Sequence, residues 1–186
     1  AYGKTTDLTA MGGAQYVHTF DKCFFMPSDL TAGLEYNRDR LKDNMWGYDR
    51  HTDQTVNIYS AFLQNEWKND RWGILIGGRL DKHNMVDNVI FSPRANLRFN
   101  PTQNINLRLS YSSGFRAPQA FDEDMHIENV GGTVAMIERA KNLKEEKSQS
   151  FSASADMYHR FGVFQTNFLI EGFYTRLTDV LSLIHI

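Results

Sequence analysis

The chain has 186 residues, with 20 lysines and arginines against 22 aspartates and glutamates, so its net charge is close to zero. This balance, without any basic run interleaved with aromatic residues, argues against a nucleic-acid partner. The single cysteine, Cys23, excludes an internal disulfide, and no Cys or His spacing matches a zinc motif. We therefore expect neither a metal site nor a cofactor.

Aromatic residues make up 13% of the chain, although its mean hydropathy is only −0.47. Abundant aromatic residues at low mean hydropathy are typical of membrane β-barrels, in which only alternate residues of each strand face lipid. No apolar run approaches the roughly 18 residues of a transmembrane helix. The first residues also lack the basic start and apolar run of a signal peptide.

Apolar and polar residues alternate along most of the chain, which is the period of a β-strand. The alternation is clearest around Leu97, Arg98 and Phe99, and again around Leu107 and Arg108. About eight antiparallel strands are predicted on this basis. In chain order they cover residues 14–25, 30–38, 54–67, 71–81, 92–100, 105–112, 149–158 and 163–176.

The predicted connections alternate between short and long. Short connections fall near residues 26–29, 68–71, 100–103 and 159–162. Long connections cover residues 41–53, 82–89 and 114–147. This alternation places all short turns at one end of the sheet and all long loops at the other, as in outer-membrane barrels with short periplasmic turns and long extracellular loops.

Aromatic residues gather beside the short turns, and charged residues occupy the polar face of the strands. The rings are predicted to form an interfacial girdle, although strands favour aromatic residues in any setting. The charged residues are predicted to line a wet lumen, whereas in a soluble sandwich they would simply face water. The lumen-lining set is Glu35, Arg79, Asp81, Arg94, Arg98, Arg108, Asp156 and Glu171.

Three segments resemble the barrel region of TonB-dependent outer-membrane receptors. The first is "FSPRANLRFNPTQNINLRLSYSSGFRAP", in which an "SPR" strand, a short turn and a strand ending in "GFRAP" occur together. The second is "NLKEEKSQSFSASADMY", and the third is the pair "YSAFLQNEW" and "WGILIGGRLDKH". The resemblance implies an all-β, antiparallel transmembrane barrel of 22-stranded type, filled by an N-terminal plug through which TonB energises import.

The chain contains neither a plug nor a TonB-contacting segment, and it provides only about eight of the strands that the resemblance implies. We therefore interpret residues 1–182 as an internal or C-terminal-half part of the barrel. Residues 183–186 leave the alternation and are interpreted as a truncation scar.

The long connections hold the candidate ligand-binding residues, because rigid scaffolds commonly present recognition residues on loops. Aromatic and basic residues in the first connection suit an iron chelate, porphyrin or corrinoid, or else pack within the loop. Arg116 faces an anionic ligand or a plug carboxylate, or else bonds to neighbouring loop carbonyls or strand acids. The acids beyond it either coordinate a cation, form a solvated rim or pair with nearby basic residues. The candidates are Trp46, Tyr48, Arg50, His51, Arg116, Asp122, Asp124 and His126.

No nucleophilic triad or phosphate-cradling glycine loop is found, so we do not expect an enzyme. The leading hypothesis is TonB-energised uptake of a scarce nutrient chelate, such as an iron siderophore, haem or cobalamin, across a Gram-negative outer membrane. Its expected partners are outer-membrane lipid, the TonB complex and a small-molecule or metal-chelate ligand. Two alternatives are a passive porin or small structural or adhesive barrel, and a soluble β-sandwich binding module.

Overall fold

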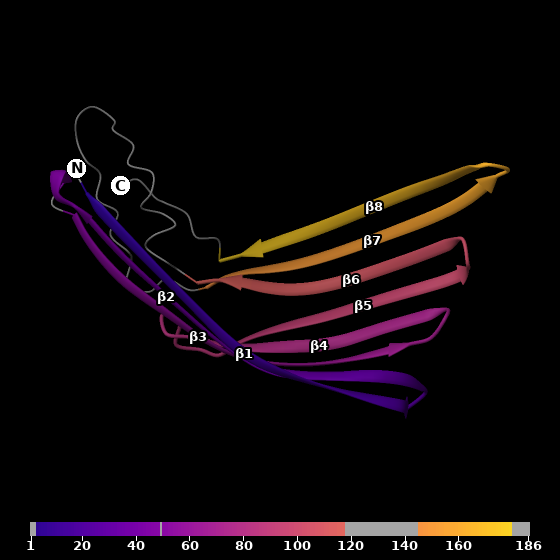
Figure 1. Ribbon diagram of the computed structural model, residues 1–186, viewed down its shortest axis with the longest axis horizontal. Helices are drawn as coiled ribbons and strands as arrows, with labels where there is room; N and C mark the ends of the chain where they lie inside the picture. The colour runs from indigo at the N-terminus through magenta and orange to yellow at the C-terminus, as the bar shows by residue number, and fades with distance from the viewer. Residues whose placement is uncertain (1–2, 49, 118–144, 180–186) are drawn as a thin grey trace.

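The computed structural model describes residues 3–48, 50–117 and 145–179. They form eight strands in a single antiparallel sheet (Figure 1). One short 3-10 helix, η1 (Trp46–Tyr48), joins two of the strands. The strands are β1 (Lys4–Cys23), β2 (Met26–Met45), β3 (Arg50–Lys68), β4 (Trp72–His83), β5 (Ile90–Thr102), β6 (Ile105–Arg116), β7 (Glu146–Phe161) and β8 (Phe164–Thr178).

Strand order follows chain order, so each strand pairs only with its neighbours in sequence. Tight connections at residues 24–25, 69–71, 103–104 and 162–163 lie at one end of the sheet. Gly162, with φ of 58°, and Phe24, with φ of 61°, adopt the left-handed conformation that tight hairpins require. This short-turn end agrees with the sequence prediction, except that the first turn precedes Met26 rather than following it.

The prediction of a long loop over residues 41–53 was wrong. β2 continues to Met45 and β3 begins at Arg50, so only residues 46–49 connect them. The ladder stays in register to the end, with Asp43 opposite Thr52 and Met45 opposite Arg50. β1 pairs with this extension from Lys4 onward. The first three strands therefore project past the far ends of the others, which Figure 1 shows clearly.

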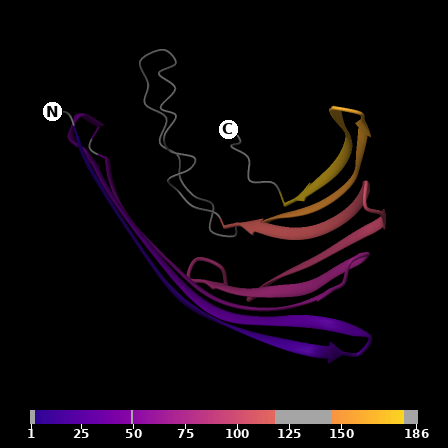
Figure 2. The same ribbon diagram turned by 45° about the vertical axis from the view of Figure 1, so that its right-hand side comes forward.

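The sheet is strongly curved (Figure 2), as expected for strands that would close into a barrel. Both edge strands, β1 and β8, lack a second neighbour within the sheet. Among the described residues, no helix is long and apolar enough to cross a membrane. The small buried cluster contains Val86, Ile90 and Ala117, with Phe115 packed against it, near the far ends of β4, β5 and β6.

Candidate functional site

The register of the ladder sorts the side chains into two faces, because directly opposite residues point the same way. On one face, Leu34 of β2 lies opposite Ala61 of β3, which lies opposite Leu80 of β4. A second row on this face runs across β5, β6 and β7, with Leu97 opposite Leu109 and Leu109 opposite Ala153. We call this the apolar face. Its large side chains are left exposed, as Leu34 is at 66%.

Aromatic rings mark the short-turn end of the apolar face. Phe25 stacks on Trp67 with ring centroids 5.8 Å apart, and Trp72 stacks on Phe99 at 4.2 Å. The indole Nε1 of Trp67 also donates a hydrogen bond to the Cys23 carbonyl at 3.0 Å, which ties the ring to the first turn. Two pairs of the rings predicted to gather beside the short turns are therefore in contact.

A third aromatic pair, Tyr36 and Tyr59, marks the end of the apolar face away from the short turns, with ring centroids 4.9 Å apart. Between Met26 and Tyr36 the chain rises roughly 33 Å along the strand, or about 25 Å across a bilayer at a tilt of about 40°. This matches the apolar band of an outer-membrane barrel. Beyond Tyr36 the same face carries Arg38 and Arg40.

All eight residues predicted to line a lumen share the opposite face, which we call the charged face. Glu35 of β2 lies in the same row as Asp81 of β4, and Arg79 lies two residues before Asp81 on the same strand. The same face continues from β4 to β8 through directly opposite residues, such as Arg98 and Arg108 on β5 and β6. The members are Glu35, Arg79, Asp81, Arg94, Arg98, Arg108, Asp156 and Glu171.

A network on the charged face ties β2, β3 and β4 together. The guanidinium of Arg79 contacts Glu35 at 2.6 Å and Asp81 at 2.8 Å, and it donates to the Ser60 hydroxyl at 2.8 Å. Ser60 in turn donates to Asp81 at 2.5 Å. Asp81 and Ser60 are buried, so each polar group depends on its partners in this network.

Basic residues occupy the charged face of β5 and β6. Arg98 lies directly opposite Arg108, and Arg94 donates a hydrogen bond to Gln64. Asp156 is buried, and one of its carboxylate oxygens has no hydrogen-bond partner among the described residues. These groups therefore present both signs of charge to whatever faces this side of the sheet.

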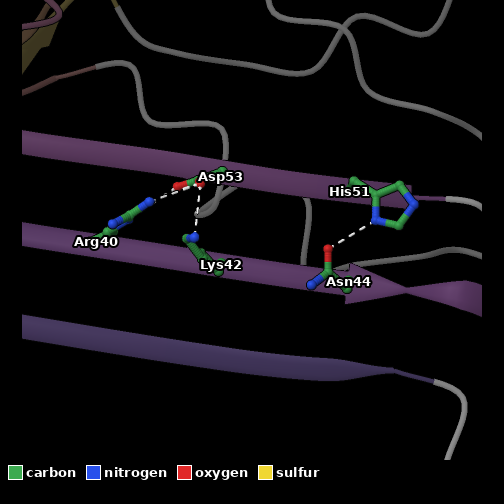
Figure 3. Close-up of polar contacts among 5 residues, drawn as sticks. All are labelled: Arg40, Lys42, Asn44, His51 and Asp53. Atoms are coloured by element: carbon green, nitrogen blue, oxygen red, sulfur yellow. Dashed lines mark hydrogen bonds and ion pairs between the residues drawn. The ribbon is translucent and has the colours of Figure 1, made fainter.

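The projecting β2–β3 hairpin carries a polar cluster on the continuation of the apolar face (Figure 3). The Asp53 carboxylate lies 3.1 Å from Arg40 and 3.4 Å from Lys42. The Arg40 guanidinium holds the pKa of Asp53 below its usual value, and Asp53 raises the pKa of Arg40. Further along, His51 and Asn44 are joined through the imidazole Nδ1 and the amide oxygen, 2.9 Å apart.

The candidate ligand-binding residues are distributed over three places. Trp46 is exposed in η1, which also contains Tyr48. Arg50 and His51 begin β3 and therefore lie on a strand rather than in a loop. Arg116 ends β6, in register with Glu146. Asp122, Asp124 and His126 lie outside the described residues, as do residues 183–186.

His83 is a buried polar residue that the sequence analysis missed. It ends β4 on the charged face and is 0% exposed. Its Nδ1 accepts a hydrogen bond from the Met85 amide at 3.0 Å, whereas Nε2 has no partner among the described residues. Burial lowers the pKa of the imidazole. The two-residue spacing of Arg79, Asp81 and His83 is the signal in the sequence that could have placed His83 on the charged face.

Asn84 fixes the connection between β4 and β5. Its side-chain amide nitrogen donates to the backbone carbonyl of Thr55 at 2.8 Å, and its side-chain oxygen accepts from the backbone amide of Asn57 at 3.0 Å. Lys82 donates to the carbonyls of Val86 and Asp87. Within the described ranges, no group of three or more His, Cys, Asp or Glu side chains is arranged to hold a metal ion.

An antiparallel meander with an apolar face of bilayer thickness and a charged opposite face is a wall segment of a transmembrane β-barrel. The chain belongs to the TonB dependent receptor-like, beta-barrel family, which matches residues 2–185. No curated protein matches the sequence.

Solved structures of similar fold include the siderophore receptor PirA from Pseudomonas aeruginosa, at 16% identity and a TM-score of 0.61 over 90% of this chain and 30% of that one. The enterobactin complex of a ferric enterobactin receptor mutant, PfeA from the same organism, has 18% identity and a TM-score of 0.61 over 84% of this chain and 25% of that one. The alcaligin outer-membrane receptor FauA from Bordetella pertussis has 14% identity and a TM-score of 0.60 over 99% of this chain and 32% of that one. The chain thus spans about a quarter to a third of their length.

Proposed function

We propose that residues 1–182 form part of the barrel wall of an outer-membrane receptor that imports a scarce metal chelate in a Gram-negative bacterium. The observation that carries this proposal is the division of one continuous sheet into an apolar and a charged face, in a chain of this receptor family. Similar structures described as siderophore receptors, one in complex with enterobactin, favour a siderophore over haem or cobalamin.

Energy for import comes, in this proposal, from TonB acting through a plug that fills the complete barrel. The charged face, with its network around Arg79 and its buried Asp156, is the surface that a polar plug or a hydrated path requires. Neither group would be tolerated against hydrocarbon, because a buried charge without partners costs several kcal/mol.

Ligand recognition is assigned to the far end of the sheet, which the projecting hairpin carries well beyond the apolar band. By residue type, Trp46 and Tyr48 supply rings for stacking, Arg50 and Arg116 supply cationic donors for an anionic chelate, and His51 supplies an imidazole. Asp122, Asp124 and His126 belong to the same end by sequence, following β6.

Growth rescue tests this function. A strain that lacks the intact gene is supplied with single iron or vitamin sources, and we expect one chelate to support growth only when the gene is restored. Inactivating TonB is expected to abolish the rescue. Uptake that persists without TonB would refute energy coupling and identify a passive pore.

Variants of the restored gene test the ligand-binding assignment. Joint replacement of Arg50 and His51 by alanine is expected to reduce chelate affinity about tenfold or more, because charge-assisted hydrogen bonds contribute about 1.5–3 kcal/mol each. Lys68→Gln, at the short-turn end, is the matched control and should leave affinity unchanged. A joint replacement of Asp122, Asp124 and His126 that left uptake unchanged would remove those three from the site.

A further inference from the structure

Charge is segregated by face on the part of the β1–β2 hairpin that lies beyond Tyr36. On the continuation of the apolar face, β2 carries Arg38, Arg40 and Lys42 at two-residue steps, each roughly 7 Å further along the strand. Their carboxylate neighbour on that face is Asp53. The opposite face of the same strand carries Asp39 and Asp43. The three cations therefore form a basic collar at the edge of the apolar band.

A groove on the apolar face begins beside the basic collar and runs from there toward the short-turn end of the sheet. Its upper part, of about 560 Å³, is lined by Gly12, Ala14, Tyr36, Tyr59 and Lys82 among others. A lower part of about 680 Å³ shares Ala14, Leu34, Ala61 and Leu80 with it, so the two are continuous. Its small side chains include Gly12 and Ala14 on β1 and Ala61 on β3, and the larger Leu34 and Tyr36 of β2 lie between these two strands. The lining is mostly apolar, so a hydrocarbon chain is a suitable occupant.

The position of the basic collar relative to the groove matches the two ends of a lipid. A chain in the groove would have its headgroup at the level of the tyrosine pair, and Arg38 lies one two-residue step above Tyr36. Lys82 lies in the same row as the tyrosines. Cations just outside an apolar band attract anionic headgroups, at about 1 kcal/mol for each lysine or arginine.

A second copy of this chain is a poorer occupant of the same surface. A twofold contact would bring the basic collar against its own symmetry mate, which opposes like charges. Asp53 balances only one of the three cations, so the collar stays positive. Exposed ion pairs of this kind are weak, and a phosphate can therefore displace Asp53 from Arg40 and Lys42.

We propose that the apolar face of β1–β4 holds a specific lipid of the outer leaflet, with an acyl chain in the groove and a headgroup phosphate on Arg38, Arg40 and Lys42. This inference rests on the membrane assignment made above but not on import. Asp53 acts as a competitor for the phosphate and sets the affinity of the site.

The experiment uses the intact receptor that contains this segment, in micelles of a neutral detergent. Native mass spectrometry measures binding of lipid A, a bisphosphorylated lipid, and of phosphatidylcholine as the zwitterionic reference. Neutralising Arg38, Arg40 and Lys42 together to glutamine is expected to weaken lipid A binding about 100-fold, at about fivefold for each cation. Asp53→Asn is expected to strengthen it several-fold.

Two further variants separate the groove from general charge effects. Gly12→Leu fills the groove, since a Cβ at Gly12 would meet open space, and it is expected to weaken binding of lipid A without unfolding the barrel. Arg160→Gln removes an exposed arginine at the short-turn end and should bind as the unaltered receptor does. A gel assay of heat-modifiability confirms folding, and Arg38→Gln alone replaces the triple variant if that variant does not fold.

Unchanged lipid A binding in the charge variants, or weaker binding after Asp53→Asn, would overturn the proposal. So would equal retention of phosphatidylcholine, or a dimer that Gly12→Leu dissociates without any lipid bound. Chelate uptake is measured on the same variants. A variant that loses lipid A but takes up the chelate normally supports the lipid site independently of import. An unaltered receptor that takes up no chelate contradicts the proposed function and leaves the lipid site unaffected.

Discussion

Removing Arg79 should destabilise the barrel through the carboxylate that it leaves behind. In Arg79→Met, Asp81 loses the contact at 2.8 Å and keeps the Ser60 hydroxyl as its remaining partner in the network. The Asp81 side chain is only 4% exposed, so water cannot replace the lost guanidinium. Breaking a buried ion pair in this way costs about 3–5 kcal/mol.

The lower end of that range applies here. Arg79 itself is 37% exposed and Glu35 is 39% exposed, so the Glu35 contact at 2.6 Å is largely a surface ion pair. Such a pair contributes at most about 1 kcal/mol. We therefore expect Arg79→Met to lower the free energy of unfolding by about 3 kcal/mol.

Urea unfolding of the intact receptor in lipid vesicles, followed by tryptophan fluorescence, measures this change. The double variant Arg79→Met, Asp81→Asn is expected to recover about 2 kcal/mol, because an amide carries no charge that must be neutralised. Arg160→Gln is the control and should stay within about 0.5 kcal/mol. A single variant that equals the control, or a double variant no more stable than the single one, would refute the reasoning.

Three other predictions concern packing, protonation and the two faces. Gly77→Ala places a Cβ 2.6 Å from the Cβ of Gln64, so overpacking should cost about 1–3 kcal/mol and lower the yield of folded protein on heat-modifiability gels. Burial lowers the pKa of His83, so the unfolded chain binds the extra proton first as pH falls through about 6.5. Stability measured by urea unfolding should therefore decline from pH 7 to pH 5. Spin labels at Leu109 and Arg108 should differ, the first accessible to oxygen dissolved in lipid and the second to a water-soluble nickel complex.

Each of these predictions has a matched control. Gly12→Ala meets open space and should fold as the unaltered protein does. His83→Asn should flatten the acid decline, and an equally steep decline would assign it to other groups. The labelling background is Cys23→Ser, and equal accessibility of the two labelled positions would contradict the assignment of the faces.

The alternation of side chains was sufficient to predict the strands and their faces. Leu97 and Leu107 fall on one face and Arg98 and Arg108 on the other, as the period of two requires. This part of the structure is local, because a strand between lipid and water must separate its side chains every second residue. The tight turns followed from the same pattern, with an error of a few residues at Phe24.

The length of β1, β2 and β3 could not be obtained from alternation. Beyond Tyr36 the outward residues become charged, as at Arg38 and Lys42, so the segment resembles a polar loop in sequence. Backbone pairing between neighbouring strands maintains the ladder there, and it has no requirement for apolar side chains.

The sequence by itself thus determined the class of fold, the two faces and the end at which the short turns lie, since these depend on neighbouring residues and the surrounding medium. Only the tertiary structure decided which residues meet across strands. The network around Arg79, the buried imidazole of His83 and the groove beside Gly12 all join residues far apart in the chain. Their formation depends on the exact pairing register, and single-strand periodicity carries no information about register between strands.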